Sequence, residues 1–120
     1  MITVYGIPNC DTVKRARAWL ADHGVVHAFH DFRKQGLPAP RAAAWLAACG
    51  ADELVNRRGT TWRGLDEATR ASLGEPASPA ATLAALAAHP SVIRRPVVEW
   101  ADGSVTVGFD AAAWARRVGA

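Results

Sequence analysis

The sequence predicts an α/β fold that begins with a strand, a helix and a strand and ends with a β-hairpin and a helix. Three observations carry this prediction. Two β-prone runs flank a helical stretch within residues 2–32, Gly and Pro divide residues 38–92 into helical segments, and an Asp-Gly pair separates two β-prone runs after Pro96. A parallel strand pair together with an antiparallel hairpin is typical of α/β layer structures.

The first third of the chain predicts a strand–helix–strand unit. Ile2–Tyr5 is β-prone and runs into the turn residues Gly6–Asn9. Helix formers with apolar residues at helical spacing predict a helix over Asp11–Asp22, which ends at Gly24. A second strand is expected over Val25–Phe32. A unit of this length implies a right-handed crossover between parallel strands.

The middle of the chain predicts helices only. Gly and Pro mark breaks between alanine-rich runs in which leucine and tryptophan supply an apolar face. The expected helices are Ala42–Ala48, Asp52–Asn56, Asp66–Leu73 and Ala80–His89.

The end of the chain predicts a hairpin and a last helix. Val97–Ala101 and Ser104–Gly108 flank the Asp102-Gly103 pair, a strong two-residue hairpin signal. Asp110 is placed to cap a helix over Ala111–Val118. The complete order, βαβ, helices, then ββα, is that of thioredoxin-like folds with a helical insertion between the second and third strands.

The length of the chain favours one domain. Its 120 residues, 50% of them hydrophobic, can bury a core without disulfides or a structural metal. We therefore expect a single domain over residues 1–120, with the insertion at about 38–92. No apolar run approaches the roughly 20 residues that span a bilayer, and no signal-peptide pattern is visible. These features predict a cytoplasmic protein with no membrane partner.

The charge of the chain limits its ligands. The formal net charge of +3 comes mainly from arginine and favours anionic ligands. The arginines are dispersed and no RNA- or DNA-binding motif accompanies them, so we expect no nucleic-acid partner. The four histidines do not form a metal-binding pattern. We expect a monomer without a metal.

Cys10 stands where the first loop becomes the first helix. The amides and partial positive charge at a helix N-terminus favour a thiolate over a thiol. Lys14 and Arg15 would add to this effect from within about one turn, whereas Asp11 would oppose it. Cys10 is therefore a candidate nucleophile for thiol redox chemistry. The alternative is an inert, partly buried cysteine.

The second cysteine does not form a local pair with Cys10. Val13 occupies the position that a C-x-x-C motif would give to the second cysteine, so a disulfide cycle would need an outside thiol. Cys49 ends an apolar helix and is more simply a small core residue. It could resolve a disulfide only if the fold brought it near Cys10.

Two segments contain candidate anion-binding arginines. Arg95 precedes Pro96, and a cis bond there would turn the backbone sharply toward the Cys10 loop, where the guanidinium could hold an anion. The segment Asn56–Arg63 combines three guanidinium groups with hydroxyls, a composition suited to carboxylates or oxyanions. The same segment could equally be a solvated loop, and Arg94 is more simply a solvated side chain.

Three blocks of the sequence resemble one known family. They are Thr3–Leu20, Asn56–Asp66 and His89–Val98. In this order they are similar to the arsenate reductase (ArsC) and Spx-related family, and within it to the YffB-like subfamily. The resemblance implies a thioredoxin fold with a helical insertion, a catalytic cysteine at Cys10, and an arginine before a structural cis-proline at Arg95-Pro96. We also expect Asn9, beside Cys10, to be a substrate- or anion-binding residue.

The resemblance also bears on the substrate. Arsenate reductases of this type hold the oxyanion with three arginines. Arg95 matches one of them. The second aligns with Asn56, with Arg57 as a neighbour that could substitute, and the third falls near Gly108, where no guanidinium is present.

For YffB-like members the resemblance implies a glutathione-dependent thiol reductase. No tightly bound cofactor is expected. Glutathione would be the co-substrate, glutaredoxin a candidate partner, and a small oxyanion or a protein disulfide the substrate. The two carboxylates of glutathione would suit Arg95 and one of Arg57 or Arg58. The alternatives are an arsenate reductase and a non-catalytic, Spx-like regulator that binds RNA polymerase.

Overall fold

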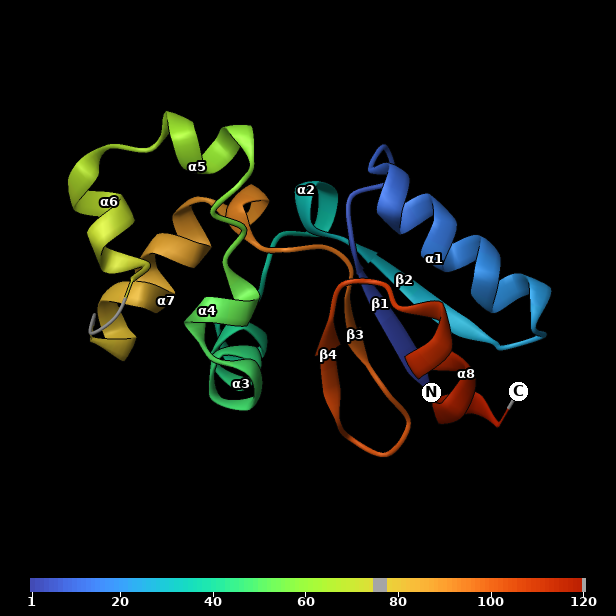
Figure 1. Ribbon diagram of the computed structural model, residues 1–120. Coiled ribbons are helices and arrows are strands. Elements are labelled where there is room, and N and C mark those ends of the chain that lie inside the picture. The colour runs from blue at the N-terminus through green and yellow to red at the C-terminus, as the bar shows by residue number, and fades with distance from the viewer. Residues whose placement is uncertain (75–77, 120) are drawn as a thin grey trace. The chain divides into compact units, whose positions relative to one another are not determined.

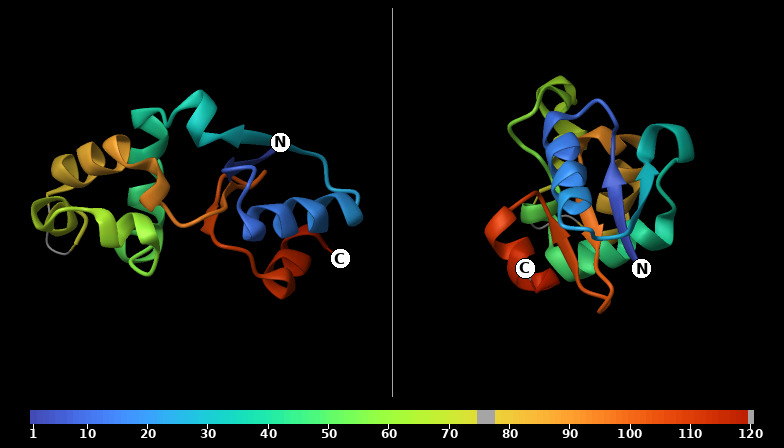
Figure 2. Two further views of the ribbon diagram at one scale, coloured as in Figure 1. Left: turned by 90° about the horizontal axis from the view of Figure 1, so that it is seen from above. Right: turned by 90° about the vertical axis from the view of Figure 1, so that its right-hand side faces the viewer.

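The computed structural model describes residues 1–74 and 78–119. The chain forms two compact units (Figures 1 and 2). Unit 1 comprises residues 1–35 and the segment that begins at Arg95, and it contains the sheet. Unit 2 comprises residues 36–94 and is helical.

The sheet of unit 1 has four strands in the order β2-β1-β3-β4. They are β1 (Ile2–Gly6), β2 (His27–Asp31), β3 (Val97–Glu99) and β4 (Val105–Val107). The pair β1·β2 is parallel, while β1·β3 and β3·β4 are antiparallel. The predicted α/β, thioredoxin-like fold is thereby confirmed, with a parallel pair and an antiparallel hairpin in one sheet.

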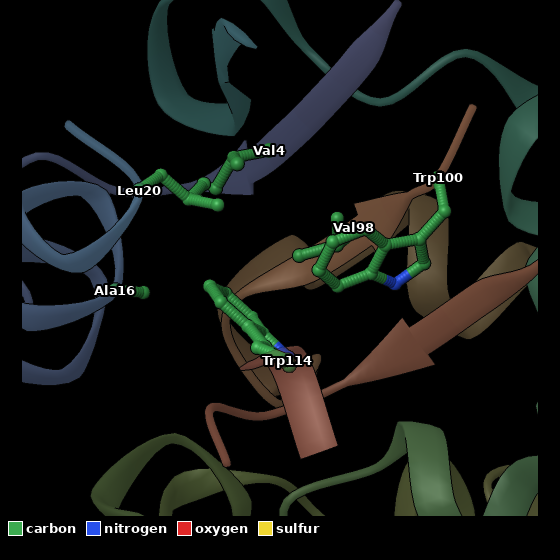
Figure 3. Close-up of a cluster of buried hydrophobic side chains, with 6 residues drawn as sticks. All are labelled: Val4, Ala16, Leu20, Val98, Trp100 and Trp114. Carbon is green, nitrogen blue, oxygen red and sulfur yellow. The ribbon is translucent and has the colours of Figure 1, made fainter. Parts of the chain in front are cut away.

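Helices α1 (Asp11–Asp22) and α8 (Ala111–Val118) pack on the same face of this sheet. Val4 and Val98 are register partners, so both side chains point to this face. Figure 3 shows them gathered with Ala16 and Leu20 of α1 and with Trp114 of α8. These five residues are at most 2% exposed, so α1 and α8 share one core with the sheet.

The two helices of unit 1 that the sequence predicts have the expected bounds. Asp110 caps α8, because its side chain accepts a hydrogen bond from the Ala113 N–H at 3.1 Å. The predicted hairpin forms with shorter strands, and its turn has three residues, Ala101–Gly103, where two were expected, because Glu99 pairs with Val105 and the Trp100 N–H donates to the Ser104 carbonyl at 2.8 Å. Gly103 has φ +88°, a left-handed conformation that glycine adopts without strain. The second strand is shorter than predicted. It does not include Val25 and Val26, and Phe32 begins the short helix α2 (Phe32–Gln35).

Unit 2 contains five α-helices and one 3₁₀ helix among its described residues. They are α3 (Ala39–Cys49), α4 (Ala51–Leu54), α5 (Thr60–Gly64), α6 (Glu67–Ser72), α7 (Pro79–Ala88) and η1 (Pro90–Val92). The four predicted helices are α3, α4, α6 and α7. The sequence analysis predicted neither α5 nor η1. Most of α5 lies in the Asn56–Arg63 segment, for which a solvated loop was one expectation, and η1 has only three residues, too few to show a helical period.

The predicted helix Asp52–Asn56 ends earlier than expected. It stops at Leu54, and Val55 instead pairs with Ile93 in an isolated antiparallel bridge. The Asn56 N–H donates to the Val92 carbonyl at 2.8 Å and the Arg94 N–H donates to the Leu54 carbonyl at 2.8 Å. Segments distant in sequence are thus joined inside unit 2. Across the described ranges, no helix has the length and hydropathy needed to span a membrane.

Candidate active site

Cys10 lies at the N-terminus of α1, directly after a tight turn from β1. Its N–H donates to the Ile7 carbonyl at 3.2 Å, which closes the turn through Pro8 and Asn9. Its carbonyl accepts the first helical hydrogen bond, from the Lys14 N–H at 2.9 Å. Cys10 is the N-cap residue, half-buried, with a free thiol. Asn9, the residue before it, is exposed.

The packing of β1 against the first turn of α1 fixes this position. Gly6 ends β1 directly beneath Val13, so a Cβ at Gly6 would lie 2.8 Å from Cγ2 of Val13. Val13 is fully buried and has little room to move. Glycine therefore permits a close approach of strand and helix, which holds Cys10 at the carboxyl end of β1.

The surroundings of Cys10 favour the thiolate. Burial raises the pKa of the thiol, but the Val13 N–H, the hydrogen-bonding Arg95 guanidinium, the Thr12 N–H and the positive charge of Arg95 together lower it below its ordinary value. The Cys10 side chain does not cap the helix with a hydrogen bond. The N–H groups of Thr12 and Val13 therefore act on the sulfur as nearby dipoles. A cysteine with a lowered pKa and partial exposure is a reactive one.

Arg95 reaches Cys10 because of the way β3 begins. The Arg95–Pro96 peptide bond is cis. Tyr5 pairs with Val97, so Arg95 and Pro96 lie beside the end of β1, where the chain turns into the Cys10 loop. Pro96 is buried, and its carbonyl accepts the Gly108 N–H at 2.8 Å. Position 108, where the family would have its third arginine, therefore lies at this corner but contributes only its backbone.

Unit 2 holds the other predicted anion-binding arginines, and their environments differ. The Arg57 guanidinium donates to Oδ1 of Asp52 at 3.0 Å and to the Leu73 carbonyl at 3.1 Å, and it lies 5.7 Å from the centre of the Trp62 ring. Arg57 therefore joins separate segments of unit 2. Arg58 is exposed, and its backbone N–H donates to Oδ1 of Asn56 at 3.1 Å.

Cys49 differs from Cys10 in its chemistry. It is half-buried at the end of α3. Burial raises the pKa of its thiol, and the negative charge of Glu53 raises it further. Cys49 therefore favours the neutral thiol, the less reactive form.

The sequence pointed to Cys10, Arg95 and Pro96 as candidate site residues, but the cations expected to act on Cys10 were different ones. It expected Lys14 and Arg15 to support the thiolate, whereas the cation that acts on the pKa of Cys10 is Arg95. The contributions of the Thr12 and Val13 N–H groups follow from the helix start that the sequence predicted. No local pattern indicated that Arg57 would bond to Asp52.

Comparison with known proteins places this site in a family. The model of the ArsC family matches residues 5–116. A protein of Haemophilus influenzae is 46% identical over 110 residues, which cover 92% of each chain. A solved YffB protein is 39% identical, with a TM-score of 0.87 and 97% of both chains covered. The global transcriptional regulator Spx of Streptococcus mutans is 26% identical over 101 residues, which cover 82% of this chain and 69% of Spx.

These matches span the cysteine loop, the helical unit and the cis-proline corner, and the match to the family model covers nearly the whole chain. The chain belongs to the ArsC family.

Proposed function

We propose that this protein is a glutathione-dependent thiol reductase in which Cys10 is the nucleophile. The observation that carries the proposal is the lowered pKa of the half-buried Cys10 thiol beside the Arg95 guanidinium. A thiolate is the form of cysteine that attacks disulfides. Val13 stands where a C-x-x-C motif has its second cysteine, so the second thiol of the cycle comes from glutathione.

The proposed reaction has two exchange steps. The Cys10 thiolate attacks the glutathione sulfur of a mixed disulfide between a substrate and glutathione, and the substrate leaves as a thiolate that takes up a proton. A second glutathione, as thiolate, then attacks the Cys10–glutathione disulfide. Its products are oxidised glutathione and the free Cys10 thiolate. In sum, the substrate–glutathione disulfide and one glutathione become the free substrate thiol and oxidised glutathione. Glutaredoxin is an alternative reductant for the second step.

Arg95 is the proposed anion-binding residue of this site. Arg95 is half-buried, so a carboxylate of glutathione would meet a partly desolvated cation. In unit 2, Arg58 is the stronger proposed anion-binding residue, because its side chain is exposed while Arg57 is engaged with Asp52. The proposal places the reaction in the cytoplasm, where glutathione is abundant and thiols stay reduced.

The test is the pH dependence of Cys10 alkylation in a Cys49→Ser protein, followed by intact-mass measurement after addition of oxidised glutathione. We expect alkylation to titrate with a pKa below the ordinary value of about 8.5, and one glutathione to add to the protein. The matched Cys10→Ser protein should gain no such adduct. If the pKa of Cys10 is not lowered and no glutathione adduct forms, the proposal that Cys10 carries out redox catalysis is wrong.

Arsenate reduction is a second candidate, favoured by membership of the ArsC family and by the Arg95 guanidinium beside Cys10. In this case Cys10 would attack arsenic, and two glutathione thiols would supply the two electrons that convert arsenate to arsenite, with water released. Replacing the disulfide by arsenate in the same coupled assay separates the two substrates. Turnover with arsenate at a rate similar to that with the disulfide would favour this candidate.

A non-catalytic regulator is the third candidate, favoured by the similarity to Spx. Such a protein would keep its affinity for RNA polymerase after Cys10→Ser, whereas an enzyme would lose turnover. Retention of the protein by immobilised RNA polymerase at low salt, together with no activity in either assay, would support this reading.

A further inference from the structure

A pocket of about 400 Å³ lies in unit 1, away from Cys10. Its large apolar lining residues are Ile2, Val25, Trp100 and Val118. Figure 1 shows the start of β1 beside α8, whereas α1, which follows Cys10, begins at the other end of β1. The length of β1 separates the two places by roughly 13 Å, at about 3.3 Å per residue. The pocket is therefore separate from the candidate active site.

The apolar floor of the pocket is fixed in position. Trp100 is 6% exposed, and its Nε1–H donates to Oγ1 of Thr106 at 2.8 Å. Its ring meets that of Trp114 edge to face, with the centres 5.2 Å apart. A tryptophan with both its ring and its N–H engaged forms a firm surface for an apolar group.

Two side chains of opposite charge lie at the rim of the same pocket. Asp102 is in the β3–β4 turn and Arg117 is in the last turn of α8, and both are exposed. Hydrogen bonds from Ser104, together with the charge of Arg117, hold the pKa of the Asp102 carboxyl below its ordinary value, so it is ionised at neutral pH. The rim therefore has one negative and one positive charge, which offset each other in sum but occupy different positions.

The two charged groups are held on either side of the Ser104 hydroxyl. This hydroxyl donates to Oδ1 of Asp102 at 2.6 Å and accepts from Nη1 of Arg117 at 2.7 Å. The Ser104 N–H donates to the same Oδ1 at 2.9 Å. A carboxylate has a second oxygen and a guanidinium has five N–H groups, so each side chain keeps hydrogen-bonding capacity for a ligand.

We propose that this pocket binds a free α-amino acid with an apolar side chain, such as phenylalanine. Such a molecule carries an ammonium, a carboxylate and a side chain on one carbon atom. The ammonium would pair with Asp102, the carboxylate would pair with Arg117, and the side chain would cover Trp100 and its apolar neighbours. The pocket volume is near the lower end of the range of about 300–1,000 Å³ that is typical of small-molecule sites, which suits a single amino acid.

The paired charges at the rim select a ligand that has both charges itself. A simple acid could pair with Arg117, but its carboxylate would lie near that of Asp102. A simple amine would meet the guanidinium of Arg117 in the same way, and such like-charge contacts disfavour both ligands. A dipolar, net-neutral ligand makes both contacts. Because the rim is exposed, its ammonium and carboxylate keep part of their hydration, which limits the cost of binding them.

The test is a ¹H–¹⁵N NMR titration of the intact chain with three ligands that share one apolar body. They are L-phenylalanine, phenethylamine, which lacks the carboxylate, and 3-phenylpropionate, which lacks the ammonium. L-Phenylalanine should shift the Trp100 indole signal and the amides of Ile2 and Val118 in a saturable manner. Each analogue should bind about threefold more weakly or worse, because it loses one exposed charge contact and meets a like charge.

Two variants separate the charges. Arg117→Gln should weaken L-phenylalanine and 3-phenylpropionate by about threefold or more and leave phenethylamine no weaker. Asp102→Asn should weaken L-phenylalanine and phenethylamine and leave 3-phenylpropionate no weaker. This variant keeps an oxygen that can accept from Ser104, and asparagine before glycine is favoured in hairpin turns. The matched variants Arg116→Gln and Asp22→Asn remove the same charges from exposed residues outside the pocket and should change each affinity by less than about 1.5-fold.

The outcomes that overturn the proposal are distinct from those that support it. If L-phenylalanine gives no saturable shift at these signals, the pocket is not an amino-acid site. If the amine or the acid binds the wild type as tightly as L-phenylalanine, recognition of both charges is wrong. The same holds if Arg117→Gln and Asp102→Asn change the three affinities equally. Activity at Cys10 enters none of these readouts.

Discussion

At the residue scale, the chemistry of the candidate active site depends on which groups surround one sulfur. Cys10 and Cys49 are both half-buried, and burial raises the pKa of each thiol. Only at Cys10 do N–H dipoles and a guanidinium outweigh this effect, whereas at Cys49 a carboxylate adds to it. The surroundings therefore favour the thiolate at Cys10 and the neutral thiol at Cys49.

Removal of the Arg95 charge should make Cys10 less reactive. Arg95→Gln removes a hydrogen bond and a positive charge from the sulfur, so the pKa of Cys10 should rise and its alkylation at neutral pH should slow by about threefold or more. The apparent glutathione requirement should also increase. Arg94→Gln is the matched control, because Arg94 is exposed and should leave the titration unchanged. Equal titration curves for both variants and the wild type would exclude Arg95 from the site.

The lowered pKa of Cys10 also predicts how stability depends on pH. Since folding lowers this pKa, the thiolate stabilises the folded state; the contribution is complete above the unfolded pKa of about 8.5 and is lost as pH falls through the folded value. The stability of the wild type relative to Cys10→Ser should therefore increase as the pH rises from below the folded pKa to about pH 9. Urea denaturation with a reductant present measures it. A constant difference across this range contradicts the prediction.

At the element scale, the site depends on a close contact between a strand and a helix. β1 ends at Gly6, and α1 begins at Asp11 with Val13 packed over that glycine. The sequence predicted both elements and the turn between them from propensity alone. It could not predict the close contact, because the distance between Gly6 and Val13 depends on how the helix lies on the sheet.

Gly6→Ala should destabilise the protein. The added methyl would lie 2.8 Å from Cγ2 of Val13, so α1 must shift, at a cost of about 1–3 kcal/mol in the free energy of unfolding. The shift should also slow Cys10 alkylation. Gly64→Ala is the matched control, because a Cβ there meets nothing within 4 Å. It should change stability by less than about 0.5 kcal/mol. Equal stability of the two variants, as measured by urea denaturation, would show that the contact can relax.

At the scale of the whole molecule, the helical unit interrupts the unit that carries the sheet. The chain leaves unit 1 after Gln35 and returns at Arg95, so unit 2 is connected to unit 1 at both ends. Each unit has its own buried residues, including Leu20 in unit 1 and Leu86 in unit 2. The prediction of one domain over residues 1–120 implies that both cores are lost together.

Core truncation in either unit should therefore shift a single unfolding transition. Leu20→Ala and Leu86→Ala each remove a fully buried side chain and should each cost about 2–5 kcal/mol. Far-UV circular dichroism and tryptophan fluorescence should give coincident curves for both variants. If Leu86→Ala instead produced an early transition and left a second one at the wild-type midpoint, the units would be separate domains.

Local signals in the sequence predicted most of the elements and singled out Cys10 as the candidate nucleophile. Helix formers, an Asp-Gly turn and the cap at Asp110 act over a few neighbouring residues, so their effects can be read from the chain. The position of Cys10 at a helix start belongs to the same class. Three short helices, α2, α5 and η1, were not predicted.

Which charged groups act on which residues depends on the tertiary structure. Arg95 acts on Cys10 because the antiparallel pairing of β3 with β1 brings the Arg95-Pro96 corner to the end of β1. The Arg57 guanidinium reaches the Leu73 carbonyl, 16 residues away in the sequence, because the chain after α4 lies beside the end of α6. Electrostatic effects depend on distance in space, and strand pairing and helix packing set that distance between residues that are far apart in the sequence.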